Sequence, residues 1–259
     1  MTKQTFLVTG ASNGIGAVYA DRLAKRGHDL VLVARSADRL QALAERLRHE
    51  AGVAVEVLAA DLGKATDLAR VEARLRDDAA ITGLVNNAGI AGEGPILTAD
   101  PAYLDGMIAL NVSAVTRLTA AIAPKLVARG TGTIINITSV TALMPEAFTV
   151  VYPATKAFVL AFSEALQAEL GPKGVHVQAV LPGITRTAIW EEERLAQIPA
   201  EMVMSVDDMV DAALAGLDLG ERITIPSLPD TADLDRFLAA RGALRPNLSH
   251  RKPAQRYGA

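Results

Sequence analysis

The 259-residue sequence contains no cysteine, only 4% aromatic residues and no excess of basic side chains. The lack of cysteine excludes disulfide bonds, thiolate nucleophiles and cysteine-ligated zinc. With a formal net charge of -3 the chain has no basic field, so we expect neither nucleic acid nor a membrane as its partner. The four histidines are scattered and predict no metal site. These absences favour a protein whose main partner is a small molecule.

The chain also lacks recognisable targeting and linker segments. Its polar N-terminus has no secretory signal pattern, and no apolar run of membrane-spanning length follows, which predicts a cytoplasmic location. Half of the residues are hydrophobic, which is enough for a large core, and no stretch rich in proline, glycine or serine divides the chain. We therefore expect a single domain over residues 1–259.

Two segments of this domain have irregular sequences. Residues 184–205 contain the only tryptophan, Trp190, and an acidic run, and we interpret them as a lid over a pocket. The tail, residues 242–259, holds four basic and no acidic side chains. Two interpretations of the tail stay open, namely a loosely ordered end of the chain and a segment that packs across an oligomer interface.

Short apolar runs alternate with longer amphipathic segments along the chain. We predict strands over Thr5–Thr9, Leu30–Ala34, Ala54–Ala59, Leu84–Asn86, Thr133–Thr138, His176–Leu181 and Arg222–Ile225. Because these runs do not alternate with polar residues, both faces of each strand should be covered by helices. The pattern predicts a Rossmann-type, doubly wound α/β fold with a parallel sheet. Asp100-Pro101 is typical of a helix start, and that helix should run to Ala128.

Glycines cluster where the first strand turns into a helix, in Thr9-Gly-Ala-Ser-Asn-Gly-Ile-Gly16. Gly10 permits a tight turn, Gly14 lets the backbone approach a pyrophosphate, and Gly16 lets the helix pack close to the sheet. The helix N-terminus adds free N–H donors. The turn predicts a dinucleotide phosphate site formed by Gly10, Ser12, Asn13, Gly14, Ile15 and Gly16.

The end of the second predicted strand bears on which dinucleotide binds. An NAD site usually places an acidic residue there, whereas this chain has Ala34 followed by Arg35. A guanidinium pairs with a 2′-phosphate, so NADP(H) is favoured over NAD(H). Ser36 is a further candidate for hydroxyl contacts.

Polar residues also follow the third and fourth predicted strands. Asp61-Leu62 and Asn87-Ala88-Gly89 stand at carboxyl ends of strands, where open α/β sheets bind their ligands. Two interpretations stay open here as well, because Asp61 also suits a helix cap and asparagine-rich turns often bind their own backbone.

Tyr152 and Lys156 lie four residues apart and therefore share one face of a predicted helix. A phenol has a pKa of about 10, so it needs a nearby cation to work as an acid or base near neutral pH. Lys156 is placed to supply that cation. Ser139 follows the fifth strand and should reach the same edge of the sheet, where its hydroxyl can bond a substrate oxygen.

Taken together, the glycine turn, Asn87-Ala88-Gly89, Asn111, Ser139, Tyr152, Lys156 and Pro182-Gly183 have the order and spacing of the short-chain dehydrogenase/reductase family, which the chain resembles from residue 5 to about residue 225. The resemblance implies that Tyr152 is the general acid/base and that Ser139 orients a carbonyl. It also implies that Lys156 binds the nicotinamide ribose and lowers the phenol pKa. Asn111 resembles the residue that anchors a proton relay to Lys156.

The resemblance further implies how the cofactor lies. It places Asp61 and Leu62 near adenine, Asn87 near the adenosine ribose, and Pro182, Gly183, Thr185 and Thr187 around the nicotinamide and phosphates. It also implies a homodimer or homotetramer built on the two long helices. In this family a hydride moves between nicotinamide and a carbon bearing oxygen, while the tyrosine carries the hydroxyl proton.

The expected substrate is a mainly apolar ketone or secondary alcohol. Its pocket walls should come from Ile90–Gly94, Leu143–Phe148, Ile184 and Ile189-Trp190, which are mostly apolar. Three alternatives stay open: a non-catalytic regulator that reports NADP(H), imine reduction, and epimerase-type chemistry on the same scaffold. The intact catalytic set argues against the regulator, which needs no activated phenol.

Overall fold

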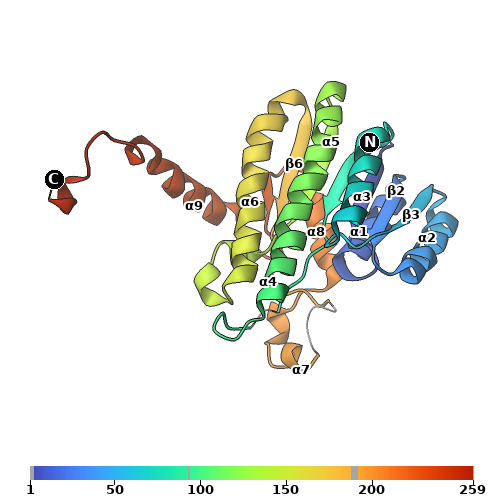
Figure 1. Ribbon diagram of the computed structural model, residues 1–259, viewed down its shortest axis with the longest axis horizontal. Helices are drawn as coiled ribbons and strands as arrows, with labels where there is room; N and C mark the ends of the chain where they lie inside the picture. Colours follow the sequence, from blue (N-terminus) through green and yellow to red (C-terminus); the bar gives the residue numbers. More distant parts are fainter. Residues whose placement is uncertain (1–2, 93, 188–191, 259) are drawn as a thin grey trace. The chain divides into compact units, whose positions relative to one another are not determined.

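A parallel sheet of seven strands forms the centre of the computed structural model, which describes residues 3–92, 94–187 and 192–258 (Figure 1). The strand order is β3-β2-β1-β4-β5-β6-β7, and every pair is parallel. The strands are β1 (Thr5–Thr9), β2 (Asp29–Ala34), β3 (Val55–Ala59), β4 (Ile81–Asn86), β5 (Gly132–Ile137), β6 (Val175–Val180) and β7 (Ile223–Thr224). The predicted doubly wound fold is confirmed, and β4 begins three residues earlier than expected.

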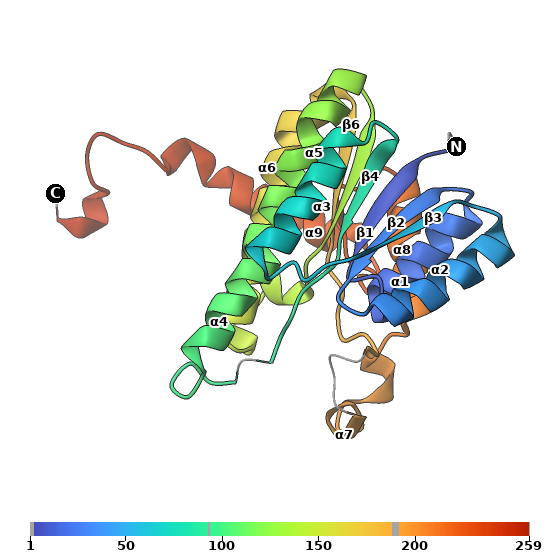
Figure 2. The same cartoon turned by 45° about the vertical axis from the view of Figure 1, so that its right-hand side comes forward.

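Helices cover both faces of the sheet (Figure 2). One face carries α1 (Gly14–Lys25), α2 (Ala37–Ala51) and α8 (Val206–Asp218), and the other carries α3 (Ala65–Asp77), α5 (Val115–Arg129) and α6 (Val151–Leu170). Successive residues of β1 pack on opposite faces of the sheet: Leu7 packs with α3 and α5, whereas Val8 packs with α1 and α8. Both are fully buried, so a strand of this composition needs a cover on each side.

The long helix that starts at Asp100 is not uniform. Asp100 caps α4 (Pro101–Ile108) by accepting a hydrogen bond from the Ala102 N–H at 3.0 Å, as the sequence predicts. Before α5 the backbone makes one π-helical segment, η1 (Ala109–Ala114), which contains the buried Asn111. The sequence did not predict this segment. A π-helical turn shifts the side chains that follow it and is found mostly at functional sites.

Together these segments form a continuous helical run, Pro101–Arg129, that is long and apolar enough to cross a membrane, with a mean hydropathy of 1.4 in its most apolar window. The sequence analysis expected no such run. Leu118, Ile122 and Leu126 from this run are buried against the sheet. A core helix of a soluble protein passes the same test of length and composition, so the run is weak evidence for a membrane.

The chain divides into two compact units, Met1–Pro226 and Ser227–Ala259, and the expected single domain with a tail from residue 242 stays a prediction. The second unit contains α9 (Thr231–Ala243) and the short turns η6 (Arg245–Asn247) and η7 (Gln255–Tyr257). Among its described residues none is buried, so it has no hydrophobic core of its own to hold it together.

The expected lid, residues 184–205, falls partly outside the described residues, including Ile189 and Trp190. Its described part contains α7 (Glu192–Leu195) and η5 (Ala200–Met202), and Leu195 is buried. The backbone of Met204 pairs with Ile184 and Arg186. The role of this segment as a lid stays a prediction. The remaining short helices are η2 (Val140–Ala142), η3 (Pro145–Ala147) and η4 (Gly171–Lys173).

Candidate active site

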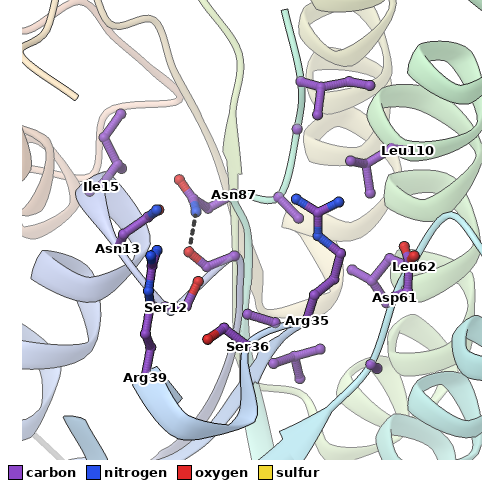
Figure 3. Close-up of a pocket in the computed structure, with 18 of the residues that line it drawn as sticks. Ser12, Asn13, Ile15, Arg35, Ser36, Arg39, Asp61, Leu62, Asn87 and Leu110 are labelled. Atoms are coloured by element: carbon purple, nitrogen blue, oxygen red, sulfur yellow. Dashed lines mark hydrogen bonds between the residues drawn. The ribbon is translucent and has the colours of Figure 1, made fainter. Parts of the chain in front are cut away.

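A cavity of about 500 Å³ opens at the carboxyl edge of the sheet, where the strand order reverses between β1 and β4. This reversal is where open α/β sheets bind ligands, because the loops on either side diverge and leave a crevice. Of the predicted cofactor residues, Gly10, Ser12, Asn13, Gly14, Ile15, Arg35, Asp61, Leu62, Asn87, Ala88, Gly89 and Thr187 line the cavity (Figure 3). The structure thus brings together side chains from the ends of four strands.

The glycine turn is packed too closely for side chains. Gly10 and Gly14 have positive φ angles of 67° and 52°, which favour glycine. At Gly16 an added Cβ would lie 2.3 Å from the Gly10 carbonyl oxygen and 2.5 Å from Asn87 Nδ2, so no larger residue fits. The turn therefore exposes backbone N–H groups at the start of α1, which suits the pyrophosphate of a dinucleotide.

Thr9 joins the glycine turn to the end of β4, a role that the sequence analysis missed. Its hydroxyl accepts hydrogen bonds from the Asn87 and Ala88 N–H groups at 2.9 and 3.1 Å and donates one to the Val85 carbonyl. The Asn87 amide donates in return to the carbonyls of Thr9 and Gly10, at 2.9 and 3.3 Å. These bonds fix two walls of the cavity relative to each other. Asn87 is thus a structural tie as well as a lining residue.

Two arginines face the far end of the cavity. The predicted Arg35 is joined there by Arg39, which the sequence analysis did not identify. Figure 3 shows the Arg39 side chain extending toward Ser12 and Asn13, and the Arg35 side chain on the other side of Ser36. Neither guanidinium forms an ion pair within the described residues. Two cations that line the cavity without an ion pair in the described part of the chain are suited to a phosphate. The sequence signal that could have identified Arg39 was its position four residues after Arg35.

Asp61 and Leu62 form another part of the cavity wall. The Asp61 carboxylate accepts a hydrogen bond from the Gly63 N–H at 3.1 Å, which is a local turn rather than a cap of α3, because α3 begins only at Ala65. Leu62 is 6% exposed and packs into the core beneath the cavity. An adenine ring needs such an arrangement of one apolar surface beside a hydrogen-bonding group.

The first two turns of α6 carry Tyr152 and Lys156. The Lys156 Nζ lies 5.6 Å from the centre of the Tyr152 ring, so the predicted pairing of phenol and cation is present in space. Lys156 is only 6% exposed and donates a hydrogen bond to the Ile137 carbonyl at 3.1 Å. Thr138 holds the same helix by donating to the Lys156 carbonyl at 2.7 Å.

The electrostatics of Lys156 follow from its burial. No carboxylate pairs with its ammonium group in the described part of the chain. Burial without such a partner disfavours the charged form and lowers the pKa of Lys156 to about 8. The ammonium is therefore still charged at neutral pH, and any negative charge that forms beside it is stabilised.

Ser139 lies in an extended conformation immediately before η2, which packs against α6. Its Oγ accepts a hydrogen bond from the Thr141 N–H at 3.2 Å, and the residue is 7% exposed. Since that bond uses a lone pair, the hydroxyl proton of Ser139 can be donated to a substrate oxygen.

Asn111, in the π-helical segment, connects this group to the cavity. Its amide accepts from the Ile90 N–H and donates to the Ile90 carbonyl, both at 2.9 Å, and also donates to Thr155 Oγ1 at 3.1 Å. The Thr155 hydroxyl donates in turn to the Tyr152 carbonyl at 2.7 Å. Asn111 thus joins the loop after β4 to the turn that carries Tyr152. The sequence analysis did not identify Thr155.

Gly89 is the boundary between the cavity and the catalytic side chains. A Cβ added there would lie 3.1 Å from Asn111 Oδ1 and 3.6 Å from Lys156 Nζ. The side chains predicted to be catalytic, together with Gly16, Pro182, Gly183 and Thr185, are not among the residues that line the cavity. The segment after β6 spans this gap, because the Pro182 carbonyl accepts from the Val140 N–H while Thr187 lies beside Gly14. Thr185 is buried and donates to the Gly183 carbonyl at 3.2 Å.

The expected substrate walls are apolar and in part open to solvent. Met144 and Phe148 are 56% and 48% exposed, and Ile96 beyond the loop after β4 is 48% exposed. Tyr103, also on the cavity wall, donates from its hydroxyl to the Ala91 carbonyl at 2.6 Å and so holds this loop against α4. Exposed apolar side chains near a catalytic group favour a ligand with large apolar parts.

Comparison with known proteins supports this geometry. A family model described as short chain dehydrogenase matches residues 4–198. The very-long-chain 3-oxoacyl-CoA reductase of Anas platyrhynchos is 39% identical over 181 residues, which are 68% of this chain and 58% of the relative. The same enzyme of Mus musculus is 32% identical over 84% of this chain and 70% of the relative. The chain thus spans less than two thirds of the length of the first of these relatives.

Solved structures match over nearly the whole chain. A short-chain dehydrogenase from Sphingobium yanoikuyae in complex with NADPH is 51% identical, with a TM-score of 0.93 that covers 97% of this chain and 98% of that chain. The bulky-bulky ketone specific alcohol dehydrogenase from Comamonas testosteroni is 45% identical, with a TM-score of 0.92 and 99% of both chains covered. Both therefore share this fold.

Proposed function

The chain belongs to the short-chain dehydrogenase family, and from that premise we propose that it is an NADP(H)-dependent oxidoreductase that interconverts a ketone and a secondary alcohol. The observation that carries the proposal is the buried ammonium of Lys156, which lies beside the ring of Tyr152 without a carboxylate partner among the described residues. A fold that keeps an uncompensated cation in its interior loses stability, so the cation has a use.

The side chains have distinct roles in this reaction. Tyr152 gives a proton to the carbonyl oxygen in reduction and takes it back in oxidation, and Lys156 stabilises the phenolate left behind. Ser139 donates a hydrogen bond to the same oxygen and orients it. Bound nicotinamide supplies or accepts the hydride. Asn111 keeps the first turn of α6 in place through Thr155.

The residues present fit NADP(H). The glycine turn leaves no room for a side chain at Gly16, so the backbone itself forms the cradle for a pyrophosphate. Arg35 and Arg39, which both line the cavity, supply two cations for a 2′-phosphate. The relative from Sphingobium yanoikuyae was solved with NADPH, which supports the same cofactor here.

We further propose a bulky apolar ketone as the substrate class. The exposed side chains of Met144 and Phe148 suit an apolar substituent larger than a methyl group. The Comamonas testosteroni relative is named for bulky-bulky ketones, and the curated relatives reduce very-long-chain 3-oxoacyl-CoA, which supports a substrate with large groups on both sides of the carbonyl.

The long helices support the expected homodimer or homotetramer. An apolar groove of about 370 Å³ lies between α5 and α6, and the rings of Phe158 and Phe162 stack beside it with their centres 5.8 Å apart. Phe158 is 40% exposed, so association would remove apolar surface from water. The cytoplasmic location stays a prediction.

The reaction is tested with Tyr152→Phe and a panel of ketones, aldehydes and imines, by following the oxidation of NADPH and NADH separately. We expect wild-type protein to reduce bulky ketones faster with NADPH, and the variant to bind NADPH while losing turnover by a factor of about 100 or more. Activity above about a tenth of wild type in the variant would remove Tyr152 from the mechanism. No turnover with any substrate would favour the regulator.

The cofactor assignment has its own test in Arg35→Ala, Arg39→Ala and the double variant. Each lost charge-assisted bond is worth about 1.5–3 kcal/mol, so the Kd for NADPH should rise about 10- to 100-fold per arginine while the Kd for NADH changes little. Arg76→Ala, at an exposed arginine that pairs only loosely with Asp77 at 3.5 Å, is the matched control. An unchanged ratio of the two Kd values would overturn the assignment.

A further inference from the structure

The C-terminal arm, which we define as Ser227–Ala259, exposes several large apolar side chains. Phe237 is 47% exposed, Leu244 57%, Leu248 73% and Tyr257 69%, and no residue of the described part of the arm, 227–258, is buried. Large apolar residues gathered in one short segment mark an interaction site more often than a bare surface.

These residues follow a helical spacing. On α9, Phe237 and Leu238 lie three and four residues after Leu234, and past the end of α9 Leu244 and Leu248 lie seven and eleven residues after Phe237. Side chains at such intervals share one side of a helix. The arm therefore presents an apolar stripe, with charged residues between its members.

The helical structure of the arm itself requires a partner. α9 has 13 residues, its N-terminus is capped by Asp230, and Arg236 pairs with Asp233. An isolated helix of this length is marginal in water even with good caps, because nucleation is costly, and most of the stability of a helix comes from packing its apolar face.

The charge of the arm points to what it packs against. The arm has six basic and three acidic residues, whereas the first 226 residues have 20 basic and 26 acidic ones, so the two parts have net charges of +3 and -6. The complementary surface is thus the body of this same protein, which is present at the same concentration as the arm. An anionic membrane is a poorer match, because Asp230, Asp233 and Asp235 stand at the start of the apolar stripe.

We propose that the C-terminal arm of one copy docks on the first unit, residues 1–226, of a second copy. The apolar stripe is removed from water in this contact, and the basic residues after Leu244 face the acidic body of the partner copy. The arm thereby adds an interface to any contact made by the long helices.

The absence of cysteine from the chain allows a clean test. Ser249→Cys introduces a single thiol in the arm, which is labelled with a photoactivatable benzophenone maleimide. Labelled protein is mixed with an excess of unlabelled wild-type protein grown in ¹⁵N, irradiated, and separated on a denaturing gel. We expect a product of twice the 27.2 kDa chain mass, in which a light arm peptide is joined to a heavy peptide from residues 1–226. Catalysis plays no part in this readout.

Several results would overturn the proposal. They are a product of single-chain mass only, a link from arm to arm, no product at all, and a product that forms only when vesicles of phosphatidylcholine and phosphatidylglycerol are added. The comparison of samples with and without vesicles distinguishes a membrane from a second copy as the ligand.

Charge substitutions in the stripe provide the second measurement. Leu244→Asp and Leu248→Asp should each lower the crosslinked fraction and weaken self-association in sedimentation equilibrium at least tenfold. The matched control is Leu219→Asp, which places the same charge on an equally exposed leucine, 79%, in the first unit. NADPH fluorescence should be unchanged in all three, which shows that they are folded. An equal loss in the control would remove the arm from the interface.

Discussion

Replacing Lys156 by methionine should make the cofactor-free protein more stable while abolishing its activity. Burial lowers the pKa of Lys156 from its usual 10.5 to about 8. At pH 7 that difference corresponds to about 3 kcal/mol by which the protonated lysine destabilises the folded state. Methionine has a similar length and no charge, so it relieves this cost. It also leaves the Ile137 carbonyl without its donor, which costs about 1–2 kcal/mol. The expected net gain at pH 7 is about 1–2 kcal/mol.

The pH dependence of this gain identifies its cause. A folded-state pKa below the unfolded one means that the unfolded chain binds more protons between about pH 8 and pH 10.5, so the stability of the wild type rises with pH across that window. The burial cost that methionine relieves should therefore shrink to below about 1 kcal/mol at pH 10, where the cost of the lost hydrogen bond exceeds it. The sign of the difference should change between about pH 9 and pH 10.5.

Urea unfolding of both cofactor-free proteins, followed by circular dichroism at pH 7 and pH 10 and at equal protein concentrations, measures the difference in free energy of unfolding. Lys64→Met, at an exposed lysine, is the control and should change stability by less than about 0.5 kcal/mol. A Lys156→Met variant that is less stable than wild type at both pH values would refute the claim that an uncompensated cation is buried beside Tyr152.

Three further predictions concern the supports of the site. Gly16→Ala should abolish NADPH binding in a fluorescence titration, because its Cβ would lie 2.3 Å from a backbone oxygen, whereas Gly106→Ala, with open space around it, should bind normally. Thr155→Val removes the hydroxyl between Asn111 and the Tyr152 turn; we expect kcat to fall about tenfold with an unchanged Kd for NADPH, and an equal rise in Kd would contradict a positioning role. Burial alone would raise the pKa of Asp21, but hydrogen bonds from basic side chains lower it to about 2. Asp21→Asn should therefore lose about 2 kcal/mol in urea unfolding at pH 7, and the loss should shrink as the pH falls from about 4 to 2.

Local features of the sequence were sufficient to predict most of the strands and the start of the long helix. The strands could be predicted because apolar runs with no polar alternation have few other uses in a chain of this length, and β1 was found with its correct ends. Asp100 marks its helix because capping depends only on neighbouring residues. The glycine turn could be read for the same reason, since its φ angles and close contacts belong to one short segment.

Other features depend on residues far apart in the chain. Thr9 matters only because β1 and β4, which are far apart in the sequence, are neighbours in the sheet. The π-helical segment at Asn111 and the division of the chain at Pro226 have no periodic pattern that announces them.

The sequence by itself determined the fold class and the glycine turn and predicted the catalytic side chains, because each rests on residue type and spacing along the chain. Only the tertiary structure decided that Lys156 is buried without a carboxylate among the described residues, that two arginines line the same cavity, and that the arm exposes an apolar stripe. Burial, pairing and exposure are properties of distances between segments, and a linear sequence does not contain those distances.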